Sequence, residues 1–149
     1  MLDERELRVF IEGAERYFAT ATKVPAATEA PFLANPRDAP AMDMTGVIGI
    51  SGTRKGLVYV TAPRVLLNNV LLAIGENDLS NDMHMDLVGE IANTISGNAR
   101  EHFGADFMIS VPVVVQGTLD CVRLPSHLRS FVIPLTWHKQ RAAIVVCLE

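Results

Sequence analysis

Residues 80–104 read SNDMHMDLVGEIANTISGNAREHFG, and this stretch decides how the rest of the chain must fold. Ser80 or Asn81 can cap the start of a helix. Gly104 is a natural end, so the pattern predicts a helix that runs to about Phe103. A mostly apolar set of residues recurs on one side at about 100° per residue, and we expect that side to pack on a sheet. The set is Val88, Ile91, Ala92, Ile95, Ala99, His102 and Phe103.

The opposite side of this predicted helix carries an unusual polar stripe. Asp86, Glu90, Asn93 and Gly97 lie four, three and four residues apart, so they share one face. Gly89 sits beside them. Glycine inside a helix costs roughly 1 kcal/mol relative to alanine, and asparagine is also a poor helix former. Since a solvated face normally favours Lys, Glu, Arg or Gln, this composition indicates a functional surface that another molecule's backbone can approach.

The segments before this helix predict two more helices and a hairpin. Asp3 to about Thr20 has apolar residues at helical spacing. Pro63 suits the first turn of a second helix, which stops at Gly75. Between these helices, strands at Met42–Ser51 and Leu57–Thr61 are expected to form a β-hairpin, with a glycine at each end of the turn. Val24–Leu33 contains two prolines and is at best an edge strand.

The segments after the helix are rich in Val, Ile and Leu and predict strands at Phe107–Leu124, Phe131–His138 and Ala142–Leu148. Turns are expected at Pro125-Ser126 and Lys139-Gln140. Strands and helices therefore come in runs, which favours an α+β fold over alternating βαβ units. We expect a single domain over residues 1–149, in which a mostly antiparallel sheet of about six strands packs with three helices.

Composition and charge exclude several classes of partner. The net charge of −4 and a pI near 5.5 argue against nucleic acid as a partner, because an acidic protein does not attract a phosphate backbone. The N-terminus carries charges of both signs without an apolar signal core, and no apolar run reaches the ~18 residues that span a bilayer. The two cysteines, Cys121 and Cys147, are expected to be buried free thiols. These features favour a cytoplasmic protein without membrane insertion.

Other candidate sites for metal binding or catalysis are weakly supported by the sequence. None of the four histidines, His84, His102, His127 and His138, forms a metal-binding spacing, and the two cysteines are not a close pair. Ser126-His127 lacks the Gly-x-Ser-x-Gly elbow of a hydrolase triad. Trp137 is interpreted as a packing residue. The sequence therefore predicts no metal site and no cofactor in this chain.

At the polar stripe the chain resembles the CheC/CheX family of chemotaxis phosphatases. The family signature is Asp or Ser, three residues, Glu, two residues, Asn, and a proline about twenty residues on. Asp86, Glu90, Asn93 and Pro112 fill these places, although the gap from Asn93 to Pro112 holds only 18 residues, about one helical turn fewer than usual. The sequences around the hairpin and Ile109–Pro112 also look similar to the CheX form. One copy of the motif, where CheC-type members have two, points to the CheX branch, whose members are homodimers.

The resemblance implies a CheC/CheX-like fold and hydrolysis of an aspartyl-phosphate on a CheY-like receiver domain in chemotaxis or two-component signalling. It gives Glu90 a salt bridge to a lysine of the receiver's active site. Asn93 suits the orientation of the attacking water, because its amide both donates and accepts hydrogen bonds. Asp86, Gly89 and Gly97 are expected to contact the partner. The magnesium ion would belong to the receiver.

Two other functions stay open at this point. The chain could keep the fold and bind a signalling protein without hydrolysing anything, and a phosphate-release assay would separate this possibility from catalysis. A small-molecule-binding domain is the third option, and it would need a concave apolar pocket.

Overall fold

The computed structural model describes residues 2–117 and 129–149. Within them the helices are α1 (Glu4–Thr22), α2 (Arg64–Ala73), α3 (Asn81–Phe103) and a short 3-10 helix, η1 (Pro36–Asp38). The strands are β1 (Ala27–Thr28), β2 (Phe32–Ala34), β3 (Met44–Gly52), β4 (Gly56–Ala62), β5 (Phe107–Ile109), β6 (Val113–Gln116), β7 (Ser130–Trp137) and β8 (Gln140–Leu148).

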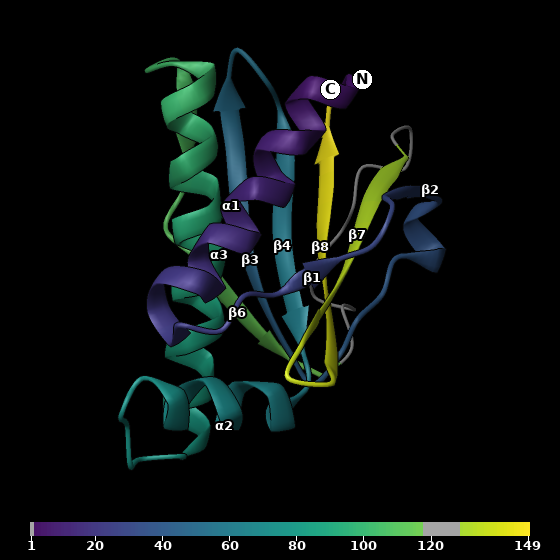
Figure 1. Cartoon of the computed structure of the whole chain (residues 1–149). Coiled ribbons are helices and arrows are strands. Elements are labelled where there is room, and N and C mark those ends of the chain that lie inside the picture. Colours follow the sequence, from purple (N-terminus) through teal and green to yellow (C-terminus); the bar gives the residue numbers. More distant parts are fainter. Residues whose placement is uncertain (1, 118–128) are drawn as a thin grey trace.

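All eight of these strands belong to one antiparallel sheet (Figure 1). Its order is β1-β7-β8-β4-β3-β5, and β2 and β6 pair with β7 and β3. β1 and β2 lie one after the other along the side of β7 that β8 does not occupy. They therefore share one strand position at that edge of the sheet, which we call a lane. β5 and β6 form the equivalent lane along β3. The sheet therefore has six lanes, as expected, and both edge lanes are split into two short strands.

Proline explains both splits. Pro31 lies between β1 and β2, and Pro112 lies between β5 and β6. Proline has no N–H to give to a ladder, so it is tolerated at sheet edges and interrupts pairing there. The prediction of a single strand over Phe107–Leu124 was wrong for this reason, since strand pairing stops at Ile109 and resumes at Val113. The end of that segment, and the turn expected at Pro125-Ser126, lie outside the described residues.

The remaining boundaries differ from expectation by a few residues at most. The turn between β7 and β8 is at His138-Lys139, one residue earlier than expected, and both residues have positive φ values of 51° and 67°. Cys147 is a buried free thiol, whereas Cys121 lies outside the described residues. Trp137 is buried, and its Nε1–H donates to the Val24 carbonyl at 2.9 Å. No helix in the described part of the chain is long and apolar enough to cross a membrane.

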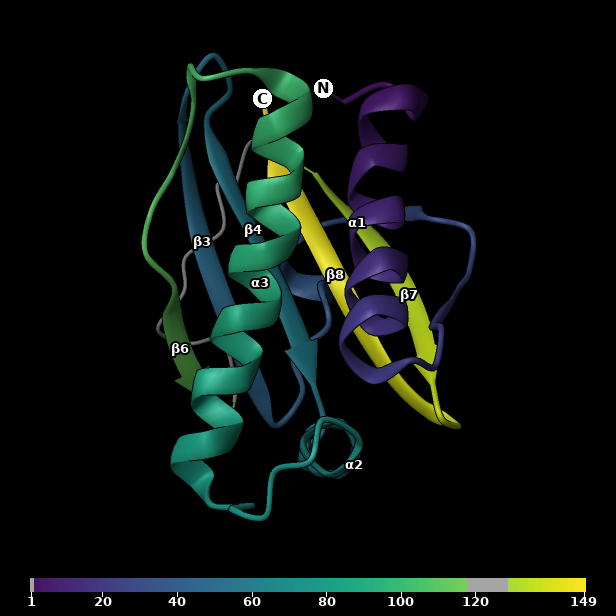
Figure 2. The same cartoon turned by 60° about the vertical axis from the view of Figure 1, so that its left-hand side comes forward.

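The strands alternate between two faces, as a period of two requires. One face is covered by α1 and α3 and holds the main core, with α2 crossing one end (Figure 2). Ile48, Val58, Ile144 and Ile133 are among the strand residues that point into it. The other face holds a smaller cluster of buried residues: Ala34, Val47, Tyr59, Val132, Ala143 and Val145. This layering presents the outer sides of α1 and α3 to solvent.

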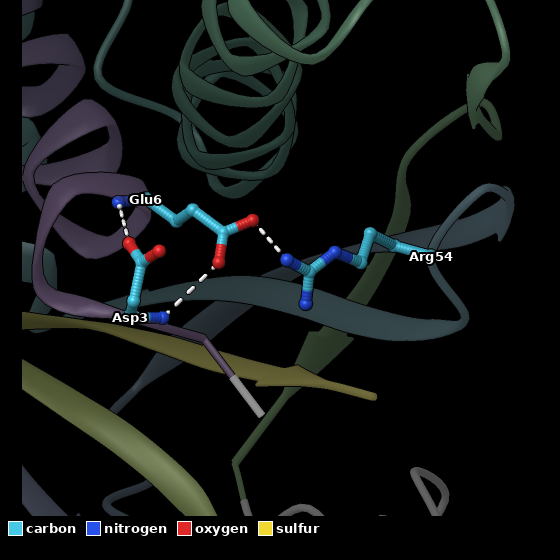
Figure 3. A network of polar contacts seen from close by, with 3 residues as sticks. All are labelled: Asp3, Glu6 and Arg54. Atoms are coloured by element: carbon cyan, nitrogen blue, oxygen red, sulfur yellow. Dashed lines mark hydrogen bonds and ion pairs between the residues drawn. The ribbon is translucent and has the colours of Figure 1, made fainter.

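A polar network fixes the start of α1 (Figure 3). The Asp3 carboxylate accepts from the Glu6 N–H at 2.8 Å, and the Glu6 carboxylate accepts from the Asp3 N–H at 3.1 Å, which completes a capping box. The other Glu6 oxygen pairs with Arg54 from the β3–β4 turn. The Arg54 guanidinium also lies 5.9 Å from the centre of the Phe103 ring. Glu6 and Arg54 thus connect α1 to the hairpin and to the end of α3.

We expect Glu6→Ala to lower the free energy of unfolding by about 1–2 kcal/mol, since it removes half of the capping box and a partly buried ion pair. Urea unfolding monitored by circular dichroism would measure the change. Glu4→Ala is the matched control, because the Glu4 side chain is 91% exposed and its pair with Arg8 spans 3.9 Å. Equal losses in the two variants would contradict the role given to the network.

Candidate functional site on α3

Helix α3 begins and ends as its sequence predicts. The Ser80 hydroxyl accepts from the Met83 N–H at 3.3 Å and caps the first turn. Gly104 ends the helix with a φ of 101°, and its N–H donates to the Arg100 carbonyl at 2.8 Å. The inner side of the helix packs on β3 and β4 through Val88, Ile91, Ala92, Ile95 and Ala99, all of which are buried. The helix is therefore held firmly, and its outer side has a defined direction.

The polar stripe lies on that outer side. Asp86, Glu90 and Asn93 are exposed, and they follow one another within two turns of the helix. Gly97 is half-buried, and a Cβ atom placed there would meet nothing within 4 Å. The structure thus leaves a carboxylate at Glu90 and a carboxamide at Asn93 together on a surface that another protein can reach.

We expected Gly89 to contact the partner, but the structure shows that it is buried. A Cβ atom here would lie 3.3 Å from Val114 Cγ2 and 3.5 Å from Pro112 Cβ. The glycine lets the edge lane of the sheet approach the helix. Pro112 therefore packs beside the helix at the stripe, despite its shortened distance from Asn93 in the sequence.

A second glycine sets how closely the helix approaches the sheet. A Cβ atom on Gly46 of β3 would lie 2.6 Å from the Val88 carbonyl oxygen and 3.2 Å from Gly89 Cα. A Cβ atom essentially never lies as close as 2.6 Å to a backbone oxygen, so only glycine permits this spacing. Gly46 and Gly89 therefore lie close together where α3 packs on β3, and Gly89 directly precedes Glu90 in the sequence.

His102 is exposed, although its spacing predicted the inner side of α3. It lines a surface depression with Val9 and Glu12 of α1, so its neighbour at the end of the helix is α1 rather than the sheet. His84, in contrast, is buried, and its ring hydrogen-bonds to the Asn68 side chain. Burial, with a smaller contribution from the Arg64 charge, lowers the pKa of His84. No cluster of metal-ligating side chains occurs in residues 2–117 and 129–149.

A groove beside Glu90 was not apparent from the sequence. It lies between α1 and α3, has a volume of about 290 Å³, and is lined by residues that include Arg16, Tyr17, Glu90, Thr94 and Asn98. The Arg16 guanidinium donates to the Asn98 side chain at 3.1 Å and closes one side. Tyr17 is buried on the inner side of α1. Helical spacing gives no signal that its ring also forms the wall next to Glu90.

The comparisons with known proteins agree with this fold and this helix. A profile of the family "chemotaxis phosphatase CheX" matches residues 44–136, more than half of the 149 residues. The matched region contains the hairpin, α3 and the edge strands that pack on it. The search of curated protein sequences found no match.

Several solved structures share the whole fold. A CheC-like superfamily protein from Shewanella sp. PV-4 is 22% identical over 99% of each chain, with a TM-score of 0.83. The chemotaxis protein CheX from Vibrio vulnificus is 23% identical over 97% of this chain and 99% of that chain, with a TM-score of 0.82. CheX in a CheX–CheY–BeF3–Mg²⁺ complex from Borrelia burgdorferi is 14% identical over 97% of each chain, with a TM-score of 0.78. The fold is CheC/CheX-like.

Proposed function

This chain belongs to the CheX family of chemotaxis phosphatases, and from that premise we propose that it hydrolyses the aspartyl-phosphate of a CheY-like receiver domain. The observation that carries the proposal is the exposure of Glu90 and Asn93 on one face of a well-anchored helix. The related complex from Borrelia burgdorferi contains CheY with BeF3 and Mg²⁺, which supports a receiver domain as the partner.

Asn93 is the residue we assign to the nucleophilic water. Hydrolysis needs water to attack phosphorus in line with the departing aspartate carboxylate, which leaves inorganic phosphate and a free aspartate. Catalysis of this step consists mainly of positioning and of charge stabilisation. The Asn93 amide can accept a hydrogen bond from the water and donate one to a phosphoryl oxygen. It cannot remove a proton, so its contribution is orientation.

Glu90 is the residue we assign to docking. Its carboxylate would pair with a lysine of the receiver's active site, and Asp86 and Gly97 would contact the rim of the same pocket. Gly97 leaves open space on the helix, so a partner's backbone can come close. Because Gly89 is buried, we assign it to packing and not to the partner. Magnesium would be supplied by the receiver in this scheme.

The test is to mix the purified protein with a phosphorylated receiver domain from the same organism and follow the loss of phosphate. We expect the receiver to lose its phosphoryl group faster than it does alone. Binding of the beryllofluoride-activated receiver is measured in parallel. Binding without any increase in hydrolysis would favour a non-catalytic interaction module and contradict the proposed activity.

Glu90→Ala should raise the receiver concentration needed for half-maximal rate by about tenfold, with a smaller effect on the maximal rate, since a desolvated charge pair at an interface is lost. Steady-state phosphate release at varied receiver concentration would show this. Glu29→Ala is the control, because the Glu29 carboxylate lies outside the stripe, between β1 and β2, and forms an exposed 3.4 Å pair with Arg141. Wild-type behaviour of Glu90→Ala would refute the assigned contact.

We further propose that residues 1–149 act as one CheX-like unit in the cytoplasm and as a homodimer. The family membership supports the dimer, and the edge lane formed by β5 and β6 offers a surface for it. Met108, Val111 and Val113 on and between these strands are 51%, 80% and 59% exposed. Large apolar side chains gathered along an edge are typical of a surface that another chain covers.

A further inference from the structure

The groove between α1 and α3 adjoins the polar stripe. Glu90 belongs to the stripe and also lines the groove, and Thr94, which directly follows Asn93, lines it as well. α1 and α3 lie side by side and antiparallel on one face of the sheet (Figure 2). Since Arg16 hydrogen-bonds to Asn98, the next turn of α1 lies nearer to Glu90. A receiver whose lysine pairs with Glu90 would therefore also lie over the groove.

The walls of the groove are mainly apolar. α1 contributes the ring of Tyr17, the methyl group of Ala21 and the exposed residue Thr20. The Tyr17 ring is in edge-on contact with Phe18, with ring centres 5.3 Å apart, so this wall is preformed. The volume of about 290 Å³ lies at the lower end of the roughly 300–1,000 Å³ typical of small-molecule sites. It suits a single large apolar side chain of another protein.

The groove also contains groups that can make polar contacts. Tyr17 is only 8% exposed, and its hydroxyl makes no hydrogen bond to any residue within 2–117 and 129–149. A tyrosine buried to this extent usually has a hydrogen-bond partner. The exposed Glu90 adds a negative charge to the same groove. This combination fits a protein segment in which an apolar side chain neighbours a cation, with a backbone carbonyl available to accept from the phenol.

We propose that the groove takes an apolar side chain of the receiver domain, from a residue close to the lysine that pairs with Glu90. The inference rests on the proposed function, because it extends the same docking step. A single charge pair leaves the receiver free to rotate about one point, and a second contact on the α1 side of the stripe removes that freedom. Burial of an apolar side chain also supplies affinity that salt does not screen.

Thr20→Trp tests the inference, because Thr20 is an exposed residue of the groove and an indole there would fill the space. We expect the dissociation constant for the beryllofluoride-activated receiver to rise about tenfold or more. The heat capacity change of binding, measured by calorimetry at several temperatures, should become less negative, since less apolar surface is buried. The receiver concentration at half-maximal rate should rise more than the maximal rate falls.

Ala19→Trp is the matched control, because Ala19 is also exposed on α1 but does not line the groove. It should bind the receiver as the wild type does, and both variants should keep the wild-type thermal midpoint. Wild-type affinity in Thr20→Trp, or an equal loss in the two tryptophan variants, would overturn the inference while leaving the proposed activity in place. Binding without hydrolysis by the wild type would instead remove the activity and leave the comparison of affinities intact.

Discussion

Asn93→Ala should lower the maximal rate of receiver dephosphorylation by about 100-fold or more while the protein still binds the receiver. The reason is that the reaction depends on the position of one water molecule, and the Asn93 amide is the group on the exposed stripe that can orient it. Loss of folding would not explain the result, because alanine is a better helix former than asparagine. Rates are to be measured at saturating receiver, and binding is to be measured with the beryllofluoride-activated form.

Asn77→Ala is the control for this experiment. Asn77 is exposed in the loop between α2 and α3, outside the polar stripe, so its loss should leave the rate unchanged. An unchanged rate in Asn93→Ala would remove Asn93 from the mechanism. A large loss of receiver affinity instead would move its role from catalysis to docking.

Gly46→Ala should destabilise the protein by about 3 kcal/mol, at the upper end of what overpacking usually costs. The added Cβ atom would lie 2.6 Å from the Val88 carbonyl oxygen and 3.0 Å from its carbon. Both are backbone atoms of a long helix, so the strain cannot be relieved by a side-chain rotation. Either α3 moves away from β3 or the strand bends, and both changes open the main core. Urea unfolding would measure the loss.

Two other glycines provide controls of the same chemistry. A Cβ atom on Gly49, also in β3, would meet the Ser110 Oγ at 3.5 Å, an ordinary contact. A Cβ atom on Gly97 would meet nothing within 4 Å, so Gly97→Ala should stabilise the helix by about 0.5–1 kcal/mol. Wild-type stability in Gly46→Ala would contradict the close helix–strand contact on which the geometry of the site depends.

The sequence predicts the position of Glu90 and Asn93 because the helical period alone decides which residues share a face. They are three positions apart in the sequence, so any α-helix brings them together, whatever it packs against. The buried side of α3 follows from the same period. Five lanes of the sheet follow from segments rich in Val, Ile and Leu between turn residues. The sixth, formed by β1 and β2, comes from a segment whose two prolines allow only an edge strand.

The expectations that differ from the structure involve residues whose environment depends on distant parts of the chain. Gly89 lies at the border of the stripe, and it is packed against Gly46 of β3 and against the edge lane that carries Pro112 and Val114. His102 has inner-side spacing but lies beside α1. Tyr17 is spaced as a core residue, and its place beside Glu90 becomes apparent only when α1 packs on α3. Local periodicity carries no information about such tertiary neighbours.

The most direct measurement is single-turnover loss of phosphate from a phosphorylated receiver with the protein in excess, so that every receiver is bound. The account predicts that wild-type protein shortens the lifetime of the aspartyl-phosphate by about 100-fold or more, whereas Asn93→Ala at the same occupancy leaves it close to that of the free receiver. Equal lifetimes with wild-type protein and with Asn93→Ala would contradict the claim that α3 delivers a catalytic carboxamide to the receiver's phosphorylated pocket.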